Sequence, residues 1–239
     1  VNQNPKLLRL YREYQASVAR SGYADKLPDP RVGANIFGDP IETASGSQTA
    51  NMSLIQSIPW IERLNAQEQQ ACFEAMAIRA EYAAERLRVI SAIRVGWYQI
   101  FVIDRQIETA LANKQLLETL IDVANARIAT GASTQGDVLL GTLELSKLEE
   151  RLLSYRERRR VFQSEVNRLV GRDAEIAIAT PDHLSISDVP TDSRAVHQIA
   201  LQSQPEIEAA RLRTQATRWG IEVARMRKRP ELTLSANYF

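Results

Sequence analysis

The sequence predicts a mainly α-helical protein built on a very long, coiled-coil-like antiparallel helical hairpin, accompanied by a small β-hairpin. Three observations lead to this fold class. Glycine and proline are scarce, at 10 and 9 of 239 residues, which favours helices. Apolar side chains recur at helical spacing on both sides of residues 126–139. The centre of that stretch holds only small residues, which is typical of a tight turn.

The first predicted helix runs from Asn4 to about Lys26, with Pro5 in its first turn and prolines behind its end. Two extended segments follow, Arg31–Gly38 and Thr49–Gln56, and the loop at 39–47 is rich in Gly, Ser and Pro. These segments predict a β-hairpin. Apolar and polar residues alternate along the second segment, which fits a strand between lipid and water. An amphipathic hairpin on a soluble protein fits the same residues.

A single long helix is predicted from about Ile61 to Ala129, because this stretch has no proline and Gly96 is its only glycine. At about 1.5 Å per residue it would span roughly 100 Å. Its second half carries a heptad seam with spacings of three and four. The seam positions are Ile103, Ile107, Ala110, Lys114, Leu117, Ile121, Ala124 and Ile128.

The return helix, expected over 134–170 and ending at Gly171, carries a matching seam. Its positions are Val138, Gly141, Leu145, Leu148, Leu152, Tyr155, Arg159, Phe162, Val166 and Leu169. Lys114 and Arg159 are the polar exceptions in the two seams. Either they extend their charged ends out of the seam, or one of them lines a water-filled space.

The turn between the two helices is predicted at 130–137. Gly131 suits a helix end with positive φ. Ser133 or Thr134 can accept hydrogen bonds from the first amides of the return helix, and Asp137 is favourable in its first turn. Because the neighbouring residues are small, we expect something to pack closely against this tip.

Residues 172–192 are expected to be irregular, and a further helix starts near Ser193 or Pro205 and continues to about Lys228. Asn4-Pro5 is matched by Gln204-Pro205 at an offset of 200, and Pro30 by Pro230. Helix, proline and strand thus occur twice, which indicates a duplicated unit. The chain is divided accordingly into 1–30, 31–59, 60–171, 172–192 and 193–239, the last being the start of a second repeat.

Composition and motifs exclude several classes of function. The net charge is +1, which does not favour nucleic-acid binding. The sequence contains no run of about 18 apolar residues, so no transmembrane helix is predicted. His183 and His197 lack partners at metal-ligand spacing, and Glu149-Glu150 is interpreted as a solvated helix face. Since no catalytic or phosphate-binding arrangement is present, we expect neither an enzyme nor a cofactor.

Several segments, in this order, resemble the TolC-like outer membrane efflux protein family. They are Asn4-Pro5-Lys-Leu, the run Leu-Pro-Asp-Pro-Arg-Val at 27–32, Gln56-Ser-Ile-Pro-Trp-Ile, and Ala126-Arg-x-x-x-Gly131-x-Ser133-x-x-x-Asp137. The resemblance covers nearly the whole chain. Members of the family are nearly twice as long and often begin with a signal or a lipidated cysteine, so we expect this chain to be truncated or processed.

The resemblance implies a homotrimer in the outer membrane and periplasm of a Gram-negative bacterium, with the β-hairpin contributing to an outer-membrane β-barrel in contact with lipid. It implies a passive exit duct that receives substrates from an inner-membrane pump of the RND type through a periplasmic adaptor protein. The adaptor would dock on the tip at Thr130, Gly131, Ala132, Ser133 and Asp137. The alternative is a soluble periplasmic coiled-coil adaptor or scaffold.

Overall fold

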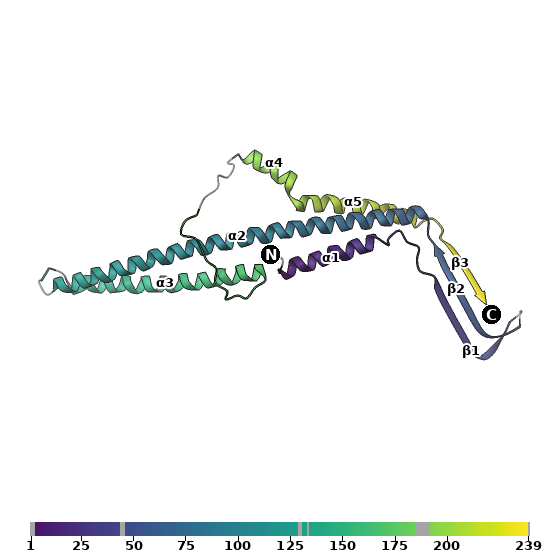
Figure 1. Ribbon diagram of the computed structural model, residues 1–239, viewed down its shortest axis with the longest axis horizontal. Helices are drawn as coiled ribbons and strands as arrows, with labels where there is room; N and C mark the ends of the chain where they lie inside the picture. Colours follow the sequence, from purple (N-terminus) through teal and green to yellow (C-terminus); the bar gives the residue numbers. More distant parts are fainter. Residues whose placement is uncertain (1–2, 44–45, 129–130, 133, 185–191, 239) are drawn as a thin grey trace. The chain divides into compact units, whose positions relative to one another are not determined.

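A computed structural model describes the chain except for residues 1–2, 44–45, 129–130, 133, 185–191 and 239. Figure 1 shows the elements in chain order. They are α1 (Pro5–Ser21), β1 (Arg31–Thr43), β2 (Gly46–Ile58), α2 (Ile61–Ile128), α3 (Gln135–Val170), α4 (Ser193–Ser203), α5 (Pro205–Met226) and β3 (Leu232–Tyr238). The chain packs as two units, Val1–Leu8 with Glu85–Asp192, and Arg9–Ala84 with Ser193–Phe239.

The predicted long helix is confirmed: α2 is continuous from Ile61 to Ile128 and passes through Gly96 without a break. In the first unit its second half lies antiparallel to α3 (Figure 1). A Cβ on Gly96 would lie 2.6 Å from Val166 Cγ2, and a Cβ on Gly141 would lie 2.8 Å from Ile121 Cγ1. Both glycines therefore permit close approach of the two helices, which offsets the cost of glycine inside a helix.

Both predicted seams are confirmed, because every seam position of α2 and α3 is buried or half-buried. Most other residues along the same stretches are exposed. The centre of this core holds Ile100, Val166 and Ile178, all almost fully buried, with Trp97 and Phe162 packed against them. Burial of the seam thus follows the heptad spacing, as expected for knobs that pack into the facing helix.

Asn4 joins the start of α1 to the end of α3. Its Oδ1 accepts from the backbone N–H groups of Lys6 and Leu7, and its Nδ2 donates to the carbonyl of Leu169 at 2.8 Å. One buried side chain therefore satisfies backbone groups at two helix termini. α1 itself ends at Ser21, earlier than the predicted Lys26, because Gly22 begins a series of turns after the helix.

The second unit contains a three-stranded antiparallel sheet in the order β1-β2-β3 (Figure 1). The predicted loop at 39–47 is wrong, because β1 continues to Thr43 and β2 begins at Gly46. The register shifts between Ile36 and Ile41, so Pro40 lies at an irregularity of an edge strand. Proline is tolerated there since it interrupts no regular ladder of hydrogen bonds.

α5 is followed by Pro230 and β3, in the same order in which α1 is followed by Pro30 and β1. The preceding segment forms its own helix, α4, because Pro205 begins α5 and the chain turns at Gln204. α5 contacts the first part of α2 through an ion pair between Arg213 and Glu81 at 2.6 Å. Within the described residues, no helix is both long enough and apolar enough to cross a membrane.

Candidate docking site at the hairpin tip

Gly131 adopts the positive φ that the sequence predicts, +71°. Its N–H donates to the carbonyl of Ile128, and the N–H of Ala132 donates to the carbonyl of Arg127, both at 3.0 Å. This pair of bonds is the Schellman arrangement that closes a helix end. A Cβ built on Gly131 would meet no atom within 4 Å, so the space beside it is open to a partner.

Thr134 is the N-cap of α3 and forms a capping box with Asp137. The N–H of Asp137 donates to Thr134 Oγ1 at 3.3 Å, and the N–H of Thr134 donates to Asp137 Oδ2 at 2.9 Å. The reciprocal bonds satisfy backbone groups of the first helical turn. Of the two caps that the sequence left open, Thr134 is therefore confirmed.

The predicted tip residues lie only partly within the described part of the chain. Gly131, Ala132 and Asp137 are exposed and lie within one turn and the first helical turn after it. Thr130 and Ser133, which were expected to offer hydroxyl groups, lie outside the described residues. A role of these residues in docking stays a prediction.

Two ion pairs cross the hairpin and hold the register on which the tip depends. Lys114 Nζ lies 2.6 Å from Glu149 Oε1, and Arg159 Nε lies 2.5 Å from Asp104 Oδ1. Each cation comes from a seam position and reaches a carboxylate on the opposite helix. The hydrogen bond that Lys114 donates to Glu149 raises the pKa of Lys114 above its ordinary value. Charged residues in a seam fix register, since a slipped pairing would lose these partners.

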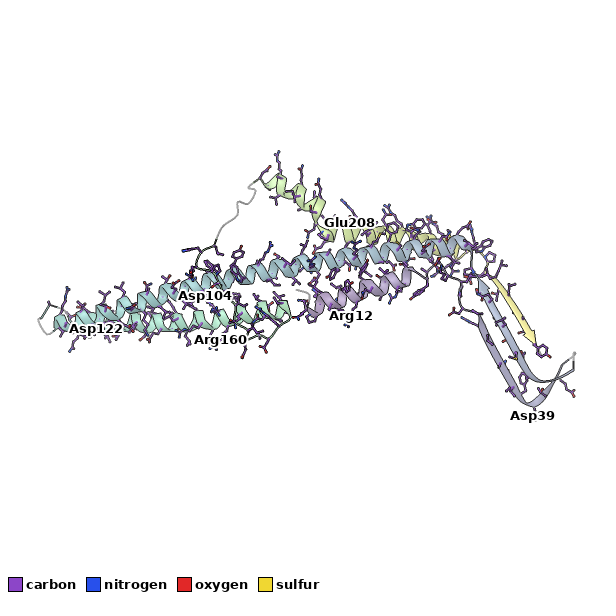
Figure 2. The ribbon with its side chains drawn as sticks, viewed as in Figure 1. Arg12, Asp39, Asp104, Asp122, Arg160 and Glu208 are labelled. Atoms are coloured by element: carbon purple, nitrogen blue, oxygen red, sulfur yellow. The ribbon has the colours of Figure 1, made fainter. Side chains whose placement is uncertain are left out.

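The two polar seam residues were expected either to extend toward solvent or to line a water-filled space. Their charged ends do leave the seam, but each ends on a carboxylate, which sequence reasoning did not anticipate. Their side chains are 30% exposed for Lys114 and 29% for Arg159. Figure 2 labels Asp104 on α2, well away from the tip. The sequence contained one signal for these pairs. Asp104 lies ten residues before Lys114, and Glu149 lies ten residues before Arg159.

Three separate hollows lie along the seam between α2 and α3. On the α2 side they are lined by the exposed apolar side chains of Val95, Tyr98, Val102, Leu116 and Leu120, together with polar Gln106 and Asn113. On the α3 side they are lined by Lys147, Arg151 and Arg158, and by Glu144, which pairs with Lys147. Surface strips of this kind mark interaction sites more often than isolated exposed residues do.

The sheet of the second unit also exposes an apolar face. Cross-strand neighbours Val32 and Leu54 are 72% and 49% exposed, and Met52 and Tyr238 are 57% and 78% exposed. The alternation predicted for the second strand is therefore matched on both neighbouring strands. Among the described residues, no group of three or more His, Cys, Asp or Glu could hold a metal ion.

The antiparallel hairpin with a capped tip, combined with the small antiparallel sheet, defines the fold of TolC-like outer membrane channels. The chain superimposes on the outer membrane protein VceC of Vibrio cholerae with a TM-score of 0.76 and 20% sequence identity. The match covers 97% of this chain and 57% of the VceC chain. A membrane protein from Pseudomonas aeruginosa matches 99% of the chain and 59% of its own, with a TM-score of 0.82 and 15% identity.

In sequence, the chain is similar to the pyoverdine export outer membrane protein OpmQ of Pseudomonas putida. The two are 24% identical over 209 residues, which is 82% of this chain and 42% of OpmQ. The chain thus spans less than half the length of this relative. No protein-family model matches the chain. The resemblance to TolC-like outer membrane efflux proteins is nevertheless confirmed in both sequence and fold.

Proposed function

We propose that this chain is part of an outer-membrane exit duct of a tripartite efflux system, which conducts substrates passively to the outside. The similarity to OpmQ, an export protein of the outer membrane, over 82% of the chain carries the proposal. The proteins of like fold are also channels rather than enzymes. The outer membrane and periplasm of a Gram-negative bacterium are the corresponding location.

The exposed faces support an assembly of several copies in contact with lipid. The apolar sheet face suits a lipid environment, since soluble proteins rarely expose a large contiguous apolar surface. The hollows along the α2/α3 seam offer apolar and charged contacts to further helices. We therefore propose a homotrimer, with a periplasmic adaptor at the tip and an inner-membrane pump of the RND type behind it.

The alternative, a soluble periplasmic adaptor or scaffold, shares the long hairpin but gives no reason for the apolar sheet face. Membrane fractionation of the complete protein separates the two. A duct remains with the outer membrane until detergent is added, whereas a scaffold is recovered in the soluble fraction. Recovery in the soluble fraction would overturn the duct proposal.

The docking role of the tip is tested with two substitutions that impose the same backbone strain. Gly131→Ala and Gly131→Leu both place an L side chain at positive φ, at a cost of roughly 1–2 kcal/mol. Leucine adds a much larger side chain than alanine to the open space beside Gly131. A partner that approaches the backbone closely is excluded by leucine and tolerates alanine, because a close-packed interface does not absorb a branched side chain.

The readouts are efflux-dependent resistance, crosslinking of the tip to a co-expressed adaptor, and trimer level in the membrane. We expect normal trimer levels for both variants, with resistance and crosslinking lost only for Gly131→Leu. Full resistance of the leucine variant would remove Gly131 from the docking surface. Asp137→Asn tests charge separately, since an asparagine oxygen still accepts from the Thr134 N–H.

A further inference from the structure

Three connections between helices and strands meet at one end of the sheet. They join α1 to β1, β2 to α2, and α5 to β3 (Figure 1). Each connection contains proline: Pro28 and Pro30 in the first, Pro59 in the second and Pro230 in the third. Because proline fixes φ, the backbone of each connection is stiffened. Between them lies a hollow of about 650 Å³, which we call the junction pocket.

Hydrogen bonds between the connections give the junction pocket a fixed shape. Gln56 Nε2, at the end of β2, donates to the Pro28 carbonyl at 2.9 Å. Trp60 Nε1, at the start of α2, donates to the Pro230 carbonyl at 2.7 Å. The connection between β2 and α2 is thus bound to both of the others. A pocket that is formed in advance loses little conformational freedom when a ligand enters it.

Part of the lining is apolar and accessible. Pro59 and Leu64 line the pocket and are buried, whereas Tyr23 and Leu27 line it with 61% and 52% of their surface exposed. Aromatic and aliphatic side chains with a few polar groups are the usual lining of small-molecule sites. The exposed tyrosine ring and leucine side chain therefore suit the apolar part of a small ligand.

The charged part of the lining is balanced, because Lys26 and Arg63 are basic and Asp29 and Glu231 are acidic. Lys26 pairs with Asp25 at 2.8 Å, and Arg63 NH1 pairs with Glu231. Arg63 Nε is buried without a hydrogen-bond partner among the described residues, so the five donors of this guanidinium are only partly used. Asp29 is exposed, and the structure gives it no ion pair with any described residue. One cation and one carboxylate are therefore open to a ligand that has both charges.

The junction pocket lies at the end of the polar face of the sheet. Ser57 lines the pocket and pairs across the strands with Thr233. Since side chains alternate between the two faces of a strand, Ser57 lies on the face opposite to Leu54 and Met52, which belong to the apolar face. If the apolar face contacts lipid, the polar face and the pocket adjoin the water-filled passage. This placement rests on the proposed function.

We propose that the junction pocket binds small zwitterions that also have an apolar ring. The carboxylate of the ligand pairs with Arg63, its cation pairs with Asp29, and its ring lies against Tyr23 and Leu27. A ligand with one charge forms one of these pairs and leaves the other group unmatched, so the pocket prefers a zwitterion. In a duct, the junction pocket is a contact site for amphipathic zwitterions in transit.

The test uses four probes that share a dansyl ring and differ in charge. Dansylamide is neutral, dansylglycine is an anion, dansylcadaverine is a cation and Nα-dansyl-lysine is a zwitterion. The 239-residue chain is titrated in detergent, dansyl fluorescence anisotropy gives each Kd, and micelles without protein give the background. We expect the Kd of the zwitterion to be at least about fivefold below that of dansylamide, since two partly exposed ion pairs form. The two singly charged probes should lie between these values.

Two substitutions separate the two pairs. Asp29→Asn should weaken binding of the zwitterion and the cation by about threefold, the range for an exposed ion pair, and leave the other two probes unchanged. Arg63→Gln should weaken binding of the zwitterion and the anion to a similar degree and leave the cation and dansylamide unchanged. Asp39→Asn on β1 and Arg12→Gln on α1 are the matched controls, because they remove the same charges at exposed positions outside the pocket (Figure 2). Neither control should change any of the four Kd values.

Equal affinity for the four probes, or no binding above the micelle background, would overturn the proposal. An equal loss for all four probes in Asp29→Asn and in Arg63→Gln would also overturn it, because damage to the fold weakens the neutral probe as well. The assay needs neither a membrane nor a partner, so its failure would leave the duct proposal standing. Recovery of the protein in the soluble fraction would overturn the duct and leave the charge preference of the pocket unaffected.

Discussion

The two glycines that close the helices of the hairpin provide a matched test of what each contributes. Gly131 and Gly171 both follow a helix and both have positive φ, +71° and +82°. Both also take part in the Schellman bonds of their helix ends. They differ in surroundings: a Cβ on Gly131 would meet nothing within 4 Å, whereas one on Gly171 would lie 2.4 Å from the Gln3 carbonyl oxygen.

Alanine at either position costs about 1–2 kcal/mol for the left-handed backbone, offset by about 0.4–1 kcal/mol from the stiffer unfolded chain. Gly131→Ala should therefore destabilise by about 1 kcal/mol. Gly171→Ala must also move the backbone at Gln3, which weakens the neighbouring bond from Asn4 to Leu169. A hydrogen bond of this kind contributes about 1 kcal/mol, so the total should be at least about 2 kcal/mol.

Both glycines lie in the unit that contains Trp97, while the other tryptophans, Trp60 and Trp219, lie in the second unit. Urea unfolding is followed by Trp97 fluorescence in a background with phenylalanine at the other two positions. We expect a clearly lower midpoint for Gly171→Ala than for Gly131→Ala. Equal midpoints would refute the argument that close approach, rather than φ alone, determines the requirement for glycine at Gly171.

Three further predictions concern the helix ends and the ion pairs. Asn4→Ala should lower the free energy of unfolding by about 1–2 kcal/mol through loss of the cap. The side chain of Gln204 makes no cap bond, so Gln204→Ala should change the free energy of unfolding by less than about 0.5 kcal/mol. Equal losses for the two variants in urea titration would contradict this. Lys114→Glu should weaken the hairpin through repulsion with Glu149, and adding Glu149→Lys should restore it, as a double-mutant cycle can show. The pKa of Lys114 is raised in the folded chain, so the stabilisation from its pair is complete below its unfolded pKa and disappears as pH rises through the folded value. Stability should thus fall above pH ~10.4 in the parent and less steeply in Lys114→Met, and parallel curves for the two would exclude the pair as the cause.

The helical hairpin could be predicted because its sequence repeats over a long distance. A strict alternation of three and four places every seam residue on one side of each helix, and in the structure all of these positions are buried or half-buried. The tip was equally accessible, because Gly131, Thr134 and Asp137 have strong local preferences at helix ends. The strands were harder: the sequence predicts a loop over 39–47, whereas pairing between the strands continues to Thr43 and Gly46.

What the sequence alone determined is the set of features that depend on local spacing: the long helices, their seams, the tip and the duplicated helix–proline–strand unit. Only the tertiary structure decided which polar groups meet. Asp104, Arg159 and Thr180 are far apart in sequence and join at one carboxylate, and Asn4 reaches Leu169 across more than 160 residues. Such contacts depend on the register and approach of packed helices. A short-range pattern contains no information about either, because many partners at different separations would satisfy the same side chain.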